Sequence, residues 1–197
     1  MIKGIIKTLL TVILVLILGI LYLSIFGLKT EKFNNQIKKS ISEVNSKINF
    51  QINDVNYLLN LKDLSINIST NNSKLSIDDR LIDIKNVKTN ISIKSFINNQ
   101  YSIDDLEIST AEIKIKDLLF FTREVHNSPQ LFILSKIIKD GSIEVDASIN
   151  FDTKGKIKND YQIKGSIKNA RLDLLNQSTF NDLNFLFNLN KNQYSLS

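Results

Sequence analysis

Two pairs of adjacent carboxylates and one histidine close to a serine are residues whose types and spacing could do chemistry. Asp78-Asp79 and Asp104-Asp105 could serve general acid–base catalysis, and His126 lies two residues before Ser128. Both acidic pairs follow turn residues, so we expect their carboxylates to face water. A serine nucleophile needs a histidine base that a third group orients, and His126 is expected in a loop. The sequence therefore predicts no enzymatic activity.

The composition excludes several other kinds of site. The 197-residue chain has no cysteine and one histidine, which rules out disulfides, thiolate metal sites and zinc sites built on several histidines. It has no phosphate-binding loop, nucleophile elbow or dinucleotide fingerprint. Its net charge of +5 is not concentrated in one basic block, which argues against nucleic acid as a partner. We expect no cofactor and no metal.

The N-terminal segment is long and apolar enough to cross a membrane. Residues Thr8–Leu28 carry no charge, and as a helix these 21 residues would extend about 32 Å, close to the roughly 30 Å of a hydrocarbon core. A buried core helix would show a polar stripe. A signal peptide would have a shorter apolar run and a small-residue cleavage site, whereas the first alanine is Ala111. We predict an uncleaved anchor over residues 8–28 after a head over residues 1–7.

The lysines beside the anchor barely decide its orientation, because Lys3 and Lys7 precede it and Lys29 and Lys32 follow it. A short head before a long apolar run usually stays in the cytoplasm as part of a signal anchor. We therefore expect a single-pass protein with a cytoplasmic N-terminus and an exported bulk.

An amphipathic helix is predicted after the anchor, within residues 29–48. Apolar residues recur there at spacings of three and four, which is one helical face: Phe33, Ile37, Ile41, Val44 and Ile48. This face could cover a β-core or lie on lipid, and we favour the first alternative.

After Asn49 the apolar period changes from 3.6 to 2, which predicts strands over residues 49–197. The 31 isoleucines suit strands, because a branched Cβ fits a pleated surface. Turn residues such as Asn71-Asn72-Ser73 and Asn98-Asn99 separate the apolar runs, so antiparallel hairpins are expected. The alternation slips between Ile108 and Ala111, which predicts a bulge near Thr110.

One segment interrupts the β-pattern, a helical insertion over about residues 117–140. Apolar residues Leu118–Phe121 begin a helical stretch that Pro129 interrupts. Ser128 then suits an N-cap with proline at the first helical position, and Asp140-Gly141 suits the end of the second helix. Two apolar helices need a surface to cover, and the sheet is the candidate.

We therefore predict a mainly β-protein, with an N-terminal transmembrane helix followed by an open, curved antiparallel β-sheet (a β-groove) partly covered by short helices. A closed sandwich is the alternative. Alternation gives one apolar and one wet face, and beside a membrane anchor an uncovered apolar face would suit an acyl chain. The residues expected to line this groove are Ile66, Ile68, Ile91, Ile93, Ile113, Ile115, Val145, Ala147, Ile163 and Ile167.

The order of these parts resembles the AsmA-like family of Gram-negative envelope proteins, related in architecture to the repeating-β-groove, chorein-type lipid bridges. The resemblance rests on residues 33–69, 80–118 and 138–176, which follow the anchor in the family's order of helix, strand pairs and glycine-started strand. It implies an inner-membrane anchor, a periplasmic groove, a role in outer-membrane lipid homeostasis, and neither cofactor nor catalysis. Family members are commonly much longer, so we expect a fragment or a short member.

Two functions remain open. The first is an inner-membrane-anchored periplasmic module that binds or transfers phospholipid or another acyl lipid, with further β-groove segments or envelope proteins as partners. The second is a structural or scaffolding envelope protein that binds a protein partner through a sheet edge. An uncovered apolar face favours the first, and a covered face with a free edge favours the second.

A reporter fused after Ser197 tests the predicted orientation. We expect an alkaline phosphatase fusion to be active, because that enzyme requires export. A fluorescent protein that folds only in the cytoplasm should stay dark at the same position. A dark phosphatase with a bright fluorescent fusion would reverse the orientation.

Overall fold

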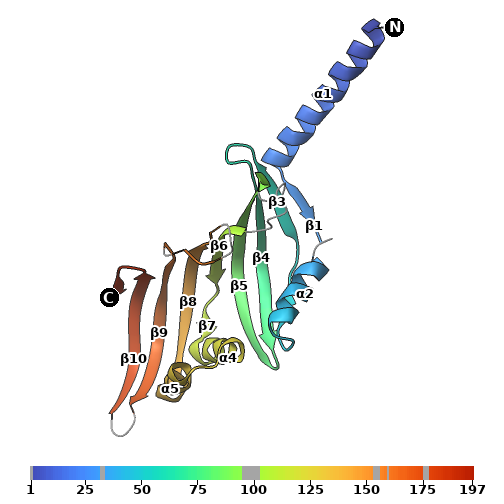
Figure 1. The fold of residues 1–197 in the computed structure, drawn as a ribbon. Coiled ribbons are helices and arrows are strands. Elements are labelled where there is room, and N and C mark those ends of the chain that lie inside the picture. Colours follow the sequence, from blue (N-terminus) through green and yellow to red (C-terminus); the bar gives the residue numbers. More distant parts are fainter. Residues whose placement is uncertain (1, 32–33, 95–102, 153–155, 159, 175–177) are drawn as a thin grey trace.

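The chain forms an isolated N-terminal helix and one open antiparallel sheet with short helices on one face (Figure 1). The computed structural model describes residues 2–31, 34–94, 103–152, 156–158, 160–174 and 178–197. The strand order is β1-β3-β4-β5-β6-β8-β9-β10-β11, with β2 paired to β4 and β7 paired to β8. The predicted open antiparallel sheet is therefore confirmed, and no pairing between its two edge strands closes it into a barrel. The strands are β1 (Leu28–Thr30), β2 (Asn49–Gln51), β3 (Val55–Asn60), β4 (Ser65–Ile77), β5 (Arg80–Ser92), β6 (Ile103–Thr110), β7 (Ile113–Lys114), β8 (Ile138–Asn150), β9 (Gln162–Leu174), β10 (Ser178–Asn190) and β11 (Tyr194–Leu196).

Helix α1 (Ile2–Ile25) is the one described helix that is long and apolar enough to cross a membrane, and none of it is buried against the rest of the chain. It ends three residues before the predicted boundary, because Gly27 has a left-handed φ of 68° and Leu28 enters β1 opposite Tyr57. A Cβ at Gly27 would lie 2.8 Å from the carbonyl oxygen of Tyr57. Only glycine fits this direct passage from helix to sheet.

Helix α2 (Asn34–Val44) is shorter than the helix predicted within residues 29–48. Residues 29 and 30 belong to β1, and the chain leaves the helix after Val44 to enter β2 at Asn49. The residues that follow α2 pack on the β-core. Ile48 is buried there, Asn45 donates a 3.0 Å hydrogen bond to the carbonyl oxygen of Glu124, and Lys47 forms a 2.9 Å ion pair with Glu124. Phe33, the turn at residues 98–99 and the side chains of residues 37, 41 and 44 lie outside what the structure describes.

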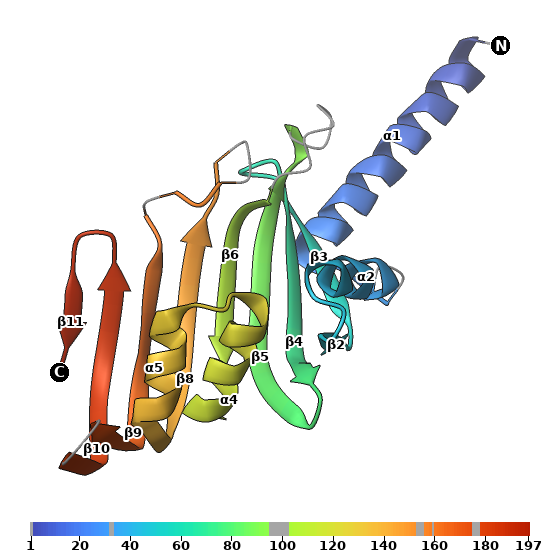
Figure 2. The ribbon, with the colours of Figure 1, turned by 60° about the horizontal axis from the view of Figure 1, so that its bottom comes forward.

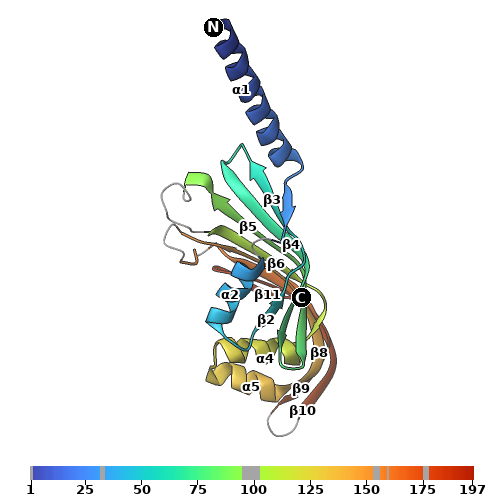
Figure 3. The same ribbon diagram turned by 90° about the vertical axis from the view of Figure 1, so that its right-hand side faces the viewer.

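The predicted helical insertion contains two helices, α4 (Ile115–Val125) and α5 (Pro129–Ile137). Ser128 is the N-cap of α5, and its hydroxyl accepts a 3.3 Å hydrogen bond from the amide of Leu131. The second helix stops earlier than predicted, because residues 138–140 pair with β9 as the start of β8. Figures 2 and 3 show α2, α4 and α5 on the same concave face of the sheet.

The core lies where these helices meet the sheet. Its buried members come from α4, from the segment after α2 and from five strands: Ile48, Ile77, Ile82, Ile113, Ile115, Leu119, Phe121, Ile143 and Ala170. A second cluster, Phe50, Ile52 and Val55, lies under β3 and β4. Leu75 and Ile84 pack against both clusters, so both clusters lie on one face of the sheet.

Irregular residues keep the apolar side chains on this face where the alternation slips. The predicted bulge near Thr110 is confirmed as a register shift, in which β5 has one extra residue, Lys85, opposite the step from Ser109 to Thr110. Other slips coincide with left-handed residues inside long strands, at Asn72 (φ 53°) and Asn169 (φ 51°). Asparagine tolerates this conformation better than most residues, because its short side chain bonds to the local backbone.

Truncation of Ile77 tests the position of the core. Its side chain is 0% exposed, whereas Leu81, just across the β4–β5 turn, is 40% exposed. We expect Ile77→Ala to lower the free energy of unfolding by about 2–5 kcal/mol, because a cavity replaces packed methyl groups. The control Leu81→Ala should cost less than about 1 kcal/mol. Denaturant unfolding of the full chain in a mild detergent, followed by circular dichroism, measures both values, and equal losses would contradict this placement of the core.

Candidate functional site

The helix-bearing face carries rows of apolar side chains that cross several strands. Directly opposite residues of neighbouring strands share a face, so the register joins residues far apart in the chain. The first row, near the end of the sheet that joins α1, is Leu59, Ile66 and Ile91. The next row is Tyr57, Ile68, Thr89, Leu106 and Ile149. The third row is Val55, Thr70, Val87, Ile108, Ala147, Ile163 and Leu189.

Five of the ten predicted groove residues lie in the part of this face that α4 and α5 leave uncovered. Their side chains are half-buried. None of them belongs to or packs against the first cluster, which includes the buried residues of α4, whereas Ile68 packs against the second cluster of Phe50, Ile52 and Val55. We call this part the open apolar face. The predicted residues on it are Ile66, Ile68, Ile91, Ala147 and Ile163. Ile93 lies just beyond the end of β5, where its amide donates a 2.8 Å hydrogen bond to the carbonyl oxygen of Leu64, and the register assigns it to neither face.

The other four predicted residues lie under the helices. Ile113 is 5% exposed, and Ile115, the first residue of α4, is 4% exposed. Val145 and Ile167 pack against the same core. Ile115 belongs to α4 itself and the other three side chains pack in the core that α4 covers, so none of the four lines an open groove. Alternation predicts which face a residue occupies, whereas coverage depends on where the helices dock.

The register adds residues to the open apolar face that sequence reasoning did not place there. Tyr57 and Leu59 were missed because the run Val55–Asn60 does not alternate. Alternation with polar neighbours could have placed four more residues in the predicted groove, namely Leu106, Ile108, Ile149 and Leu189.

The open apolar face begins beside the candidate anchor. The β3–β4 turn lies at the base of α1 (Figure 1), and it holds Leu61 and Leu64 in water at 42% and 48% exposure. The side chain of Asn60 accepts hydrogen bonds from the amides of Lys62 and Asp63 at 3.0 and 3.2 Å, which fixes the turn. Two exposed leucines on a rigid turn beside an apolar helix would fit a membrane interface.

The opposite face of the sheet is polar and crossed by ion pairs. Lys85 pairs with Glu144 across the sheet, and Lys168 lies 3.3 Å from Glu112. The hydrogen bond from Ser142 and the ammonium of Lys168 hold the pKa of Glu112 below its ordinary value, and the bond to Glu144 raises the pKa of Lys85. These groups are solvent-exposed, so water screens their interactions, and they mark this face as wet.

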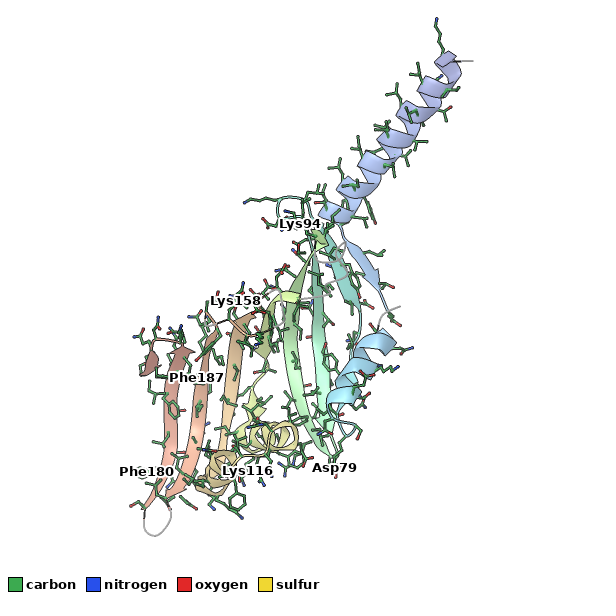
Figure 4. All side chains as sticks on the ribbon, viewed as in Figure 1. Asp79, Lys94, Lys116, Lys158, Phe180 and Phe187 are labelled. Atoms are coloured by element: carbon green, nitrogen blue, oxygen red, sulfur yellow. The ribbon has the colours of Figure 1, made fainter. Side chains whose placement is uncertain are left out.

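The residues with possible chemistry do not converge. Asp79 lies exposed at the β4–β5 turn (Figure 4), whereas Asp105 accepts 2.9 and 2.6 Å hydrogen bonds from the amide and side chain of Asn90. His126 is exposed at the end of α4, and Ser128 is occupied as an N-cap. In the part of the chain that the structure describes, no group of three or more histidine or acidic side chains could hold a metal ion.

No family model, curated protein or solved structure matches this chain. Its function must therefore be inferred from its own geometry.

Two aspartate substitutions distinguish the open apolar face from the core. Ile113→Asp should unfold the domain or cost several kcal/mol, because an unpaired charge would lie beneath α4. Ile66→Asp should leave a cooperative unfolding transition, because water reaches the open apolar face. Denaturant unfolding of the two full-length variants measures the difference. Equal loss of structure would show that a second layer covers the face at Ile66.

Proposed function

We propose that this protein is an inner-membrane-anchored periplasmic module that binds or transfers a phospholipid or another acyl lipid, without catalysis. The open apolar face carries this proposal. Its rows of apolar side chains cross β3, β4, β5, β6, β8 and β9, it lies outside the core that α4 covers, and it begins beside a candidate transmembrane helix. The resemblance to AsmA-like proteins in the order of parts points in the same direction, and it is the source of the proposed compartment.

The energetics of the face suit reversible capture of an acyl chain. Each buried CH₂ group contributes about 0.8 kcal/mol, so a chain that covers the open apolar face needs no charged clamp to bind. The face is lined by branched aliphatic side chains with few aromatic rings, so it offers contact area along the strands without a specific shape. It therefore fits a flexible hydrocarbon chain better than a rigid ligand.

The position of the face beside the anchor supports a route from the bilayer. The passage from α1 to β1 contains two residues, Phe26 and Gly27, so the first apolar row is close to the membrane end of the anchor. Leu61 and Leu64 extend the apolar surface at that end. An acyl chain could leave the bilayer and reach the sheet with little exposure to water.

A second candidate function is binding of a further β-segment or an envelope protein through a sheet edge. Strand β11 covers only the end of β10, where residues 187–189 pair with residues 194–196 and Leu186 bonds to Ser197. Residues 178–185 of β10 have no strand on their outer side in the described part of the chain. Such an edge can accept another strand by main-chain hydrogen bonding.

Photocrosslinking in cells tests the lipid proposal. A photoreactive amino acid at Ile66 or Ile91 should give lipid adducts, whereas the same residue at Asn67 or Asn90 should give none. Each pair is a matched control, because Asn67 and Asn90 lie directly opposite each other on the polar face, one step along the strands. Mass spectrometry identifies the adduct. Equal labelling of both pairs would reject the lipid proposal, and protein adducts at residues 178–185 alone would favour the edge.

A further inference from the structure

We propose that a cationic pocket between α4 and α5 binds the phosphate group of an organic phosphate ester. The pocket has a volume of about 270 Å³ and lies on the helices, at the end of the sheet remote from α1 (Figure 4). It is separate from the open apolar face, so it does not depend on the function proposed above. Its lining residues come from three elements: Arg80, Lys116, Leu119, Phe120, Arg123, Phe132, Ser135 and Lys136.

The charges around the pocket favour an anion. Four of its eight lining residues are cationic, and none is acidic. The nearest acids are already engaged, because Asp117 lies 3.4 Å from Arg80 and Glu124 forms its 2.9 Å ion pair with Lys47. One acidic contact beside four cations leaves an excess of positive charge, which an anionic phosphate group would offset.

Arg123 has a buried N–H donor that lacks a hydrogen-bond acceptor. Its Nε is buried and has no partner, although one of its terminal nitrogens lies 3.4 Å from the hydroxyl of Ser135. An unpaired buried N–H group is costly, so an acceptor at this position would be favourable. The guanidinium carbon of Arg123 and the ammonium of Lys136 lie 5.3 and 5.4 Å from the centre of one ring, that of Phe132. A bound anion would offset the repulsion of two cations that contact the same aromatic ring.

The aromatic walls favour an ester over inorganic phosphate. The guanidinium carbon of Arg80 lies 4.3 Å from the centre of the Phe120 ring. One of its terminal nitrogens already lies 3.3 Å from the carbonyl oxygen of Lys116 and 3.4 Å from Asp117, so its remaining N–H groups would bind phosphate oxygens. Leu119, Phe120 and Phe132 would contact the organic part of the ligand. A lipid headgroup and a soluble phosphate ester share this chemistry.

Calorimetric titration of the full chain in an uncharged detergent tests the pocket with three probes, inorganic phosphate, phenyl phosphate and a short-chain phosphatidylglycerol below its micelle concentration. We expect saturable binding of phenyl phosphate, tighter than that of inorganic phosphate and weakened by salt. Arg123→Gln and Lys136→Gln should each weaken it by at least about tenfold. Lys88→Gln, the same charge change on the polar face, should leave it unchanged.

Each outcome decides the proposal. Tighter binding of phosphatidylglycerol than of phenyl phosphate, weakened by Arg123→Gln and Lys136→Gln, would assign the ester to a lipid headgroup, because acyl chains on the open apolar face would not respond to these substitutions. The reverse order of affinities would assign it to a soluble molecule. Inorganic phosphate that binds as tightly as phenyl phosphate would overturn the ester. Absence of saturable binding, or equal loss in Lys88→Gln, would overturn the site. Lys136 is exposed, so Lys136→Gln remains informative even if Arg123→Gln fails to fold.

Discussion

The sheet depends on one constraint. Every strand must present its apolar side chains to the same face, although successive side chains of a strand point to opposite faces. A single uncompensated slip in the middle of a strand would point the isoleucine side chains of one half of that strand toward water. The chain meets this constraint with an extra residue in β5 and with left-handed asparagine and aspartate residues at Asn72, Asn169 and Asp182. Bulges of this kind also bend strands, so the same devices that preserve the apolar face contribute to its concavity.

The helices divide this one face into two regions with different physics. Under α4, the isoleucines lose almost all contact with water and stabilise the fold, as Ile77 and Ile113 do. Toward α1, residues of the same type remain half-exposed and contribute less to stability. The chain thus retains solvent-accessible apolar area that folding alone does not require, which is the usual mark of a surface that binds something.

Much of the fold could be predicted from the residues, because alternation, proline and asparagine act locally. The open sheet, the N-cap at Ser128 and the slip near Thr110 all follow from such signals. The limits arise where distant segments compete for the same residues. Residues 28–30 form a strand because they pair with β3. Residues 138–140 pair with β9 and do not extend the predicted helix. Coverage of Ile113 and the meeting of Arg80 with Arg123 depend on helix docking, which no local pattern encodes.

The left-handed glycine between α1 and β1 has a mechanical consequence. A flexible tether would let the sheet tumble beside the membrane and sample many orientations. Here the chain has no slack, because the carbonyl oxygen of Tyr57 closes over Gly27 and β1 pairs with β3 at once. The sheet therefore has a fixed orientation relative to α1. In a membrane, a tilt of this candidate transmembrane helix would therefore be transmitted to all of the strands and would change the angle at which the sheet projects.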